Sequence, residues 1–463
     1  MSSNKPSLPK GTRDFTPSEM VKRNFIYDTI KTVFKKYGYA EIQTPSMENL
    51  QTLTGKYGDE GDKLIFKILN SGEFLNEPKK KGYDFAAENN SNKLVSLISE
   101  KALRYDLTVP FARFVVMHQN ELSFPFKRFQ IQPVWRADRP QKGRYREFYQ
   151  CDADVVGSES LLNEAEFVLI YTEALKALGL KDFTIKLNNR KILSGIAEII
   201  GKPALIVDMT VAIDKLDKIG MDGVSKELLE KGFTEADIER LKPVILLQGS
   251  NLDKLRQLKE VLKATEVGLK GIEEIEEVIS YVSKLTGSAP EDIQHLGIDI
   301  TLARGLNYYT GCIFEVATNE VAMGSIGGGG RYDDLTGMFG LKDLTGVGVS
   351  FGADRIYDVL EELNLFPAST VQGTKVLISN FDKEAENYAL PILAQLRNAG
   401  IAAELYPTSA KLKKQMAYAD AKNIPYVILI GSEEISANMV TVKNMLTGEQ
   451  EKVALSAIVD KLG

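Results

Sequence analysis

The chain has 463 residues, enough for two to four domains that each bury a core. Hydrophobic residues at 44% and charged residues at 26% are ordinary globular values, so a disordered or fibrous protein is excluded. The 57 basic residues against 63 acidic ones give a net charge of −6, which excludes a uniformly basic nucleic-acid binder but leaves room for a local basic groove.

The few cysteines and histidines exclude further classes. Cys151 and Cys312 cannot form a disulfide framework, and with only His118 and His295 beside them a structural zinc site is not expected. The N-terminus has no apolar signal segment, and no apolar run reaches the roughly 18 residues that cross a bilayer. We therefore expect a cytoplasmic protein without membrane partners.

The first region predicts a long amphipathic helix. Thr16, Pro17 and Glu19 are typical of a helix start, and apolar residues at helical spacing follow over 21–37. A strand-like run then ends at Pro45. The polar stretch from Asn70 to Ser99, which contains three consecutive lysines, predicts a surface insertion or mobile loop.

The middle and the end of the chain differ in their patterns. Residues 126–157 predict strand, charged loop and strand, and residues 188–290 carry Lys, Glu, Leu and Ile at helical spacing, which indicates a mainly helical inserted domain. Strand signals return over 298–352. The last ninety or so residues alternate strand and helix, which predicts a small α/β domain with a largely parallel sheet.

The charged loop is the strongest local signal. Its arginines and lysines outnumber its single acid, Asp138, and give a net charge of +6 within an acidic protein. Flanking strands would hold the arginines rigidly enough to grip phosphate, although a solvated hairpin tip is the alternative. The basic residues are Lys127, Arg128, Arg136, Arg139, Lys142, Arg144 and Arg146.

Two further segments indicate ligands. Gly352 and Arg355 stand three residues apart, which would place a guanidinium at the first turn of a helix and favour an anion. Arg304 lies close to Tyr308 and Tyr309, a mixture that suits a planar polar ligand. The glycine run 327–330 is by itself weak evidence, because such runs are as often flexible connectors.

Together these segments resemble the class II aminoacyl-tRNA synthetases, and specifically the histidyl-tRNA synthetase family. Two segments are similar to signatures that other class II enzymes lack. The chain departs from the family at Asn307, where aspartate is usual, and at 104–110, where many bacterial members read RPEGT. The resembling segments are PKGTRDF at 9–15, IQTPSMEN at 42–49 (motif 1), 136–157 (motif 2), 346–356 (motif 3), and the histidine signatures LARGLNYYTG at 302–311 and GGGGRYDDL at 327–335.

The resemblance implies an α+β catalytic core on a mainly antiparallel sheet, with a helical insertion and a C-terminal α/β domain that binds the anticodon. It also implies a homodimer. The implied ranges are 1–187 and 291–366 for the two parts of the core, 188–290 for the insertion and 373–463 for the anticodon-binding domain.

The resemblance also implies roles for individual residues. Arg304 and Arg136 would be catalytic, Arg139 and Gln141 would contact tRNA, and no metal ligand is assigned. The implied histidine-binding residues are Asp106, Leu107, Thr108, Arg136, Gln150, Asp154, Arg304, Tyr308 and Tyr309, and the ATP-binding residues are Arg136, Arg144, Phe148 and Arg355.

The implied activity is ATP-dependent ligation of L-histidine to tRNA(His) through a histidyl-adenylate, with Mg²⁺ bridging the phosphates of ATP. The alternative is a non-catalytic paralogue that regulates histidine biosynthesis. That alternative is disfavoured because such paralogues usually lack the C-terminal domain and the arginine signature, and this chain has both.

Overall fold

The computed structural model describes residues 5–85, 91–303, 308–367 and 373–463. The chain forms two compact units. One contains residues 1–14 and 23–366, and the other contains residues 15–22 and 367–463.

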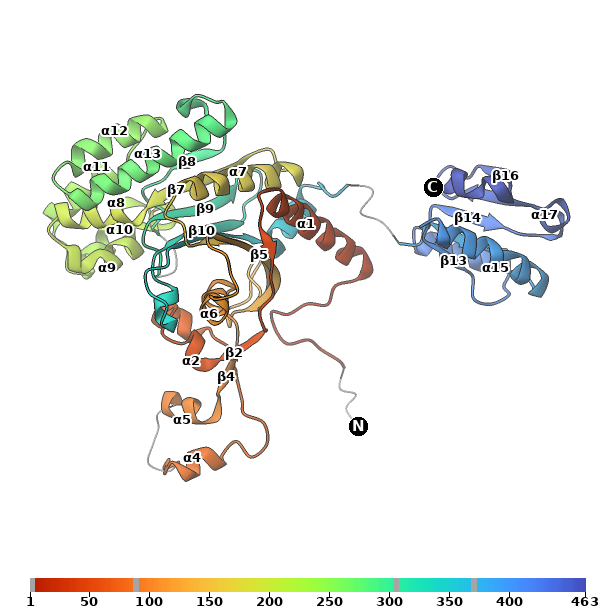
Figure 1. Cartoon of the computed structure of the whole chain (residues 1–463), viewed down its shortest axis with the longest axis horizontal. Helices are drawn as coiled ribbons and strands as arrows, with labels where there is room; N and C mark the ends of the chain where they lie inside the picture. Colours follow the sequence, from red (N-terminus) through yellow and green to blue (C-terminus); the bar gives the residue numbers. More distant parts are fainter. Residues whose placement is uncertain (1–4, 86–90, 304–307, 368–372) are drawn as a thin grey trace. The chain divides into compact units, whose positions relative to one another are not determined.

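An eight-stranded sheet is the centre of the first unit (Figure 1). Only its two outermost pairs, β1 with β5 and β7 with β8, are parallel, and all the others are antiparallel. The mainly antiparallel core is therefore confirmed. In spatial order the strands are β1 (Ala40–Glu41), β5 (Phe126–Trp135), β6 (Glu147–Val156), β11 (Gly346–Gly352), β10 (Gly327–Tyr332), β9 (Cys312–Thr318), β7 (Phe183–Asn189) and β8 (Leu296–Ile298).

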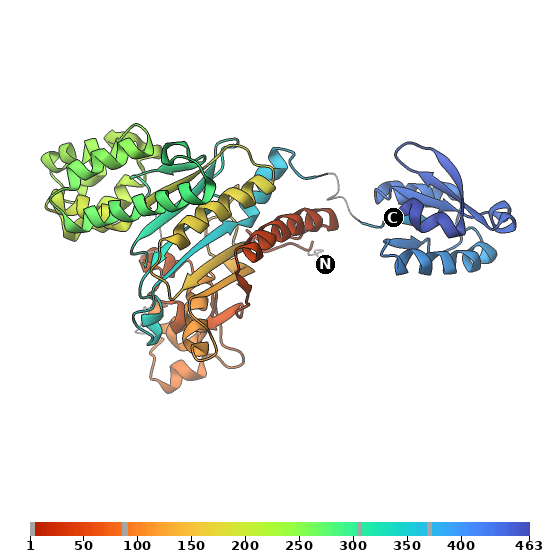
Figure 2. The same cartoon turned by 45° about the horizontal axis from the view of Figure 1, so that its top comes forward.

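The two faces of this sheet differ because strand side chains alternate. Phe129, Ala153 and Val349 face the large hydrophobic core, which also contains residues of α1 (Pro17–Lys36) and α7 (Leu162–Ala177). The long helix α7 runs along this face (Figure 2). The intervening residues, among them Asp152 and Ser350, are polar and share the opposite face. The alternation thus produces one apolar face, which packs against the helices, and one polar face.

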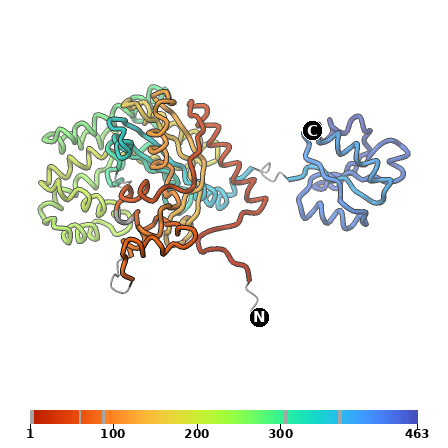
Figure 3. Tube along the Cα trace, turned by 60° about the horizontal axis from the view of Figure 1, so that its bottom comes forward, coloured from red at the N-terminus to blue at the C-terminus, as the bar shows by residue number. Residues whose placement is uncertain are grey.

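The segment expected to be helical contains six α-helices and a short 3-10 helix, and they gather at a different end of the unit from α4 and α5 (Figure 1, Figure 3). Ile192 and Ile275 of this segment belong to the same hydrophobic core as the sheet. Its division as a separate domain stays a prediction. The helices are α8 (Arg190–Ile199), α9 (Ile206–Ile213), α10 (Leu216–Glu230), α11 (Glu235–Ile245), α12 (Asn251–Leu262) and α13 (Glu266–Thr286).

Residues 42–122 build a smaller layer with its own core, which includes Val109 and Phe111. The sequence predicts a surface insertion or mobile loop over 70–99, and the described part of this stretch contains two short helices, α4 (Asn76–Lys80) and α5 (Ser91–Ile98). Residues 86–90 lie outside the described residues. The other elements are the sheet β2 (Met47–Asn49), β4 (Lys101–Leu103) and β3 (Lys67–Ile68), with α2 (Leu50–Leu53), α3 (Gly58–Lys63) and α6 (Thr108–His118).

The C-terminal residues form a five-stranded sheet with its own core, which includes Val376 and Leu396. The first three strands pair in parallel as expected, but β15 and β16 extend the sheet as an antiparallel hairpin that the sequence reading did not assign. The elements are β12 (Val376–Ile378), α15 (Lys383–Asn398), β13 (Ala403–Leu405), α16 (Leu412–Ala421), β14 (Tyr426–Leu429), α17 (Ser432–Ala437), β15 (Met439–Asn444), β16 (Gln450–Ala454) and α18 (Ile458–Leu462).

None of the helices in the described ranges is both long and apolar enough to span a bilayer.

Candidate active site

The β5–β6 hairpin places Arg136 at the rim of the polar face. The two strands pair as far as Trp135 and Glu147, so Arg136 begins the loop. Its Nε donates a hydrogen bond to the carbonyl oxygen of Tyr105 at 3.1 Å, and its guanidinium lies 4.3 Å from the Tyr105 ring and 5.2 Å from the Phe148 ring. These contacts fix the arginine in one orientation.

Arg355 approaches the same place from α14 (Ala353–Glu362), the helix that follows β11. Its Nε donates to the carbonyl oxygen of Gly143 at 2.7 Å and its Nη1 to that of Ser325 at 2.5 Å. Burial lowers the pKa of Arg355, and the nearby charges of Arg144 and Arg136 lower it further. Positive charge gathered this closely is typical of a site for a polyanion.

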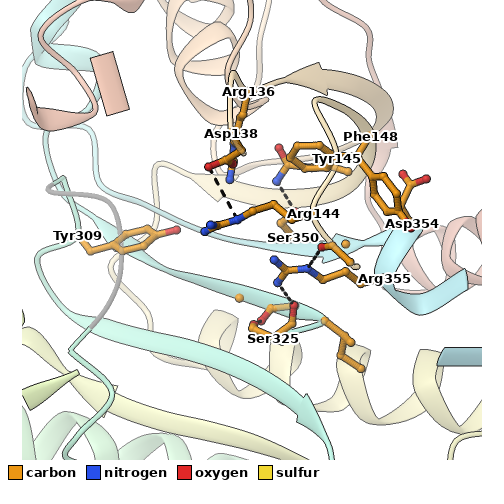
Figure 4. A pocket seen from close by; sticks show the side chains of 16 residues that line it. Arg136, Asp138, Arg144, Tyr145, Phe148, Tyr309, Ser325, Ser350, Asp354 and Arg355 are labelled. Atoms are coloured by element: carbon orange, nitrogen blue, oxygen red, sulfur yellow. Dashed lines mark hydrogen bonds and ion pairs between the residues drawn. The ribbon is translucent and has the colours of Figure 1, made fainter. Parts of the chain in front are cut away.

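A cavity of about 280 Å³ opens between these arginines. Figure 4 shows Arg136, Arg144 and Arg355 around it, with Tyr309 and Phe148 on opposite sides. Six of the predicted site residues line it together. The lining residues are Arg136, Asp138, Gly143, Arg144, Tyr145, Phe148, Gln150, Tyr309, Ser325, Ile326, Gly327, Gly328, Ser350, Gly352, Asp354 and Arg355.

A second group of predicted residues surrounds a buried carboxylate, Asp106. Its Oδ1 accepts a hydrogen bond from the Tyr57 hydroxyl at 2.9 Å, and its Oδ2 accepts one from the Tyr308 hydroxyl at 3.3 Å. Burial raises the pKa of Asp106. Leu107 and Thr108 follow it at the start of α6, and Leu107 is fully buried.

Asp154 is the second carboxylate among the predicted histidine-binding residues, and it already has partners within the protein. It forms an ion pair with Arg128 at 2.6 Å and accepts a hydrogen bond from the Tyr332 hydroxyl at 2.7 Å. All three side chains are buried, and burial raises the pKa of Asp154 although Arg128 opposes the shift. Asp154 therefore contributes to folding, and it lies on the polar face of the sheet.

The structure also explains part of the basic density of the hairpin. Arg128 pairs with Asp154, Lys127 with Glu166, and Lys142 with Glu362. Acidic side chains of the protein itself neutralise these three cations, so their positive charge does not require a bound polyanion. Two further arginines of the hairpin, Arg136 and Arg144, line the cavity, and Arg144 also lies 3.8 Å from Asp138.

Two polar residues in or beside the cavity, Asp354 and Asp152, were not predicted from the sequence as site residues. Asp354 lines the cavity and binds the guanidinium groups of Arg13 and Arg23 and, at 2.7 Å, the backbone N–H of Tyr149. Asp152 lies beside the cavity, and burial raises its pKa to about 7. The alternation along β6 was the available signal for Asp152, because it shares a face with predicted residues on either side.

The remaining predicted residues are elsewhere. Arg304 lies outside the described residues. Arg139 and Gln141 are exposed near the hairpin tip and do not line the cavity. Across the described ranges, no group of three or more His, Cys, Asp or Glu side chains is arranged to hold a metal ion.

Comparisons with known proteins point to one family. A family model described as histidyl-tRNA synthetase matches residues 87–356, and one described as an anticodon binding domain matches residues 375–463. A curated protein of Christiangramia forsetii named histidine–tRNA ligase is 59% identical over 455 residues and is matched over 98% of both chains.

Solved structures agree. The crystal structure of histidyl-tRNA synthetase from Nostoc sp. PCC 7120 aligns with a TM-score of 0.82 at 32% identity, over 98% of both chains. A protein from Bacillus halodurans titled as an ATP phosphoribosyltransferase regulatory subunit/histidyl-tRNA synthetase aligns with a TM-score of 0.71 over 92% of this chain and 100% of that one. At 20% identity, the second likeness shows the fold alone.

Proposed function

The chain belongs to the histidyl-tRNA synthetase family, and we propose that its polar sheet face activates L-histidine with ATP and transfers it to tRNA(His). The single observation that supports this most directly is the cavity that Arg136, Arg144 and Arg355 line together. Arginines suit a triphosphate, and carboxylates suit the ammonium and imidazole groups of histidine.

In the proposed arrangement, Arg144 and Arg355 hold the outer phosphates of ATP and Phe148 stacks on adenine. Arg136 holds the α-phosphate and the histidine carboxylate, and Arg304 stabilises the α-phosphate charge. Asp106, Leu107, Thr108 and Gln150 lie around the α-ammonium group, with Asp154, Tyr308 and Tyr309 on the imidazole side. Contacts between the two sets of residues support placing histidine next to ATP. Tyr308 donates a hydrogen bond to Asp106, and its ring centroid lies 5.0 Å from that of Tyr309, which lines the cavity.

The chemistry needs little from the protein beyond position and charge. The histidine carboxylate is already a nucleophile, so it attacks the α-phosphorus without a general base, and pyrophosphate leaves. The arginines stabilise the charge that builds on the phosphate oxygens. In the second step, a terminal ribose hydroxyl of tRNA attacks the carbonyl carbon of the mixed anhydride, and AMP leaves.

We propose Mg²⁺ as the ion that accompanies ATP, because a hard cation prefers the phosphate oxygens. Arg139 and Gln141 are proposed to contact tRNA from the hairpin tip. The match of residues 375–463 to an anticodon binding domain supports placing the anticodon there, within the proposed domain 373–463. The other proposed ranges are 1–187 and 291–366 for the two parts of the catalytic core and 188–290 for the helical insertion.

A homodimer in the cytoplasm is proposed as the working form. Exposed apolar side chains support an interface near motif 1 and α6, since Met47 is 54% exposed, Met117 67% and Phe124 40%. Exposed apolar side chains are often found at protein contacts. Size-exclusion chromatography with light scattering would test the dimer.

The catalytic function is favoured over the regulatory alternative, because the curated relative at 59% identity is named as a ligase. ATP–pyrophosphate exchange with each of the twenty amino acids is the direct test. Exchange with L-histidine alone, followed by charging of tRNA(His), is the expected result. Exchange with a different amino acid, or none with histidine, would overturn the proposal.

A further inference from the structure

Asp152 is a buried carboxylate to which the proposed reaction gives no role. It lies on β6 between Gln150 and Asp154, is 2% exposed, and its Oδ1 has no hydrogen-bond partner among the described residues. Removing a carboxylate from water costs folding free energy unless the group is well paired. A carboxylate kept in such a place therefore requires a reason.

Ser350 links Asp152 to the cavity. The strand register places the two residues directly opposite each other on β6 and β11, where Cβ atoms lie about 5 Å apart. Burial raises the pKa of Asp152, and this effect is opposed first by the charge of Arg128 and then by a hydrogen bond with the Ser350 side chain. Gln130, opposite Asp152 on β5, directs its amide nitrogen to Thr44 and Gln132 instead.

Gln150 is the next member of the chain of contacts. Its Nε2 donates a hydrogen bond to Oγ of Ser350 at 2.7 Å. Its Oε1 is buried and has no partner among the described residues, although Gln150 lines the cavity. The amide thus presents an unpaired acceptor at the cavity wall.

We propose that Asp152 is a positioning residue that acts through Ser350 to keep the Gln150 amide oxygen directed to the α-ammonium group of the substrate. Above pH 7 the Asp152 carboxyl is mainly ionised and only accepts, so the Ser350 hydroxyl must donate to it. Ser350 can then only accept from Gln150, which turns the amide nitrogen inward and leaves the oxygen for an ammonium donor. The inference rests on the proposed role of Gln150 in histidine binding.

The variant Asp152→Asn tests the direction of the hydrogen bonds that link Asp152, Ser350 and Gln150, and it changes the shape of the side chain little. Its amide can donate to Ser350, which allows Ser350 to donate to Gln150 and allows the Gln150 NH₂ group to face the ammonium. At pH 8, where the wild-type carboxyl is ionised, the KM for histidine in ATP–pyrophosphate exchange is expected to rise about tenfold to a hundredfold, while the KM for ATP stays close to that of the wild type.

The double variant Asp152→Asn, Gln150→Glu provides a rescue that a purely structural role would not give. A carboxylate at position 150 accepts from Ser350 with one oxygen and from the ammonium with the other. The reversed direction of the hydrogen bonds therefore no longer impairs histidine binding. The KM for histidine should return toward the wild-type value. Equal rises in the KM for histidine and for ATP that the second change does not repair would overturn the proposal.

Gln150→Ala separates this inference from its foundation. If Gln150→Ala leaves the KM for histidine unchanged, the proposed role of Gln150 in histidine binding is wrong, and the positioning role proposed for Asp152 fails with it. If Gln150→Ala weakens histidine binding but Asp152→Asn does not, only the positioning role of Asp152 is overturned. Absence of histidine-dependent exchange in the wild type would instead contradict the proposed function.

Discussion

Gly348 lies directly opposite Asp154 across the β6–β11 pair, and a methyl group on Gly348 would overlap the Asp154 carboxylate. The glycine is therefore required for space, because its absent side chain makes the room in which the carboxylate sits. This relationship joins motif 3 to motif 2 over nearly two hundred residues of sequence.

Gly348→Ala is expected to displace Asp154 and to raise the KM for histidine by about tenfold or more, while the KM for ATP changes little. Pyrophosphate exchange measures both constants. The matched control is Gly297→Ala on β8 of the same sheet, where a Cβ would meet only ordinary contact with Thr184 at 3.5 Å. Equal effects of the two substitutions would show that steric room at Asp154 is not what matters.

Asp154→Ala should also destabilise the fold. It would leave the guanidinium of Arg128, which is 0% exposed, without its ion-pair partner, a loss of about 3–5 kcal/mol of unfolding free energy. Chemical denaturation measures this loss. Glu433→Ala, which removes an exposed pair with Lys452, serves as the comparison and should cost less than about 1 kcal/mol. A cost for Asp154→Ala as small as that of the control would mean that Arg128 finds another partner.

Arg355→Ala should weaken ATP binding. Its side chain contributes positive charge to the cavity, so the KM for ATP should rise about tenfold to a hundredfold with the KM for histidine nearly unchanged. Lys142→Ala is the control, because this exposed cation in the loop between β5 and β6 pairs with Glu362 and lies outside the cavity lining. An unchanged KM for ATP in Arg355→Ala would exclude Arg355 from phosphate binding.

The raised pKa of Asp152 predicts how stability depends on pH. The carboxyl group has a pKa of about 7 in the folded protein, against a usual 3.8, because burial disfavours its charge. Between these values the folded state holds a proton that the unfolded state has lost, so this group favours folding less as pH rises from about 4 to about 7.

Asp152→Asn removes this titration. The unfolding free energy of the wild type relative to the variant should therefore fall between pH 5 and pH 8, as measured by denaturation at several pH values. A constant difference across that range would show that Asp152 keeps one charge state throughout.

A chain that ends at Phe366 is expected to form histidyl-adenylate but to charge tRNA poorly. The described residues proposed for adenylation all precede this position, and the core around Val376 and Leu396 is separate from the core of the large sheet. Pyrophosphate exchange and tRNA charging would be measured side by side on the shortened and full chains. Loss of exchange in a shortened chain that remains folded would contradict the division of labour.

Much of the fold could be predicted from the sequence, because its signals are local. The alternation in β6, the helix start at Thr16 and the helical spacing beyond residue 188 depend on neighbours within a few residues. The short helices α4 and α5 and the last hairpin, β15 with β16, were not predicted. Their segments are short or polar, and packing decides such cases more than intrinsic preference does.

The sequence by itself determined which residue types are present and which of them share a strand face. Only the tertiary structure decided what each one does. Arg128 and Arg136 stand in the same basic segment, yet Arg128 is buried against Asp154 while Arg136 lines the cavity. The physical reason is register: pairing of β5 with β6 and of β6 with β11 brings together residues distant in sequence, and no local pattern specifies those partners.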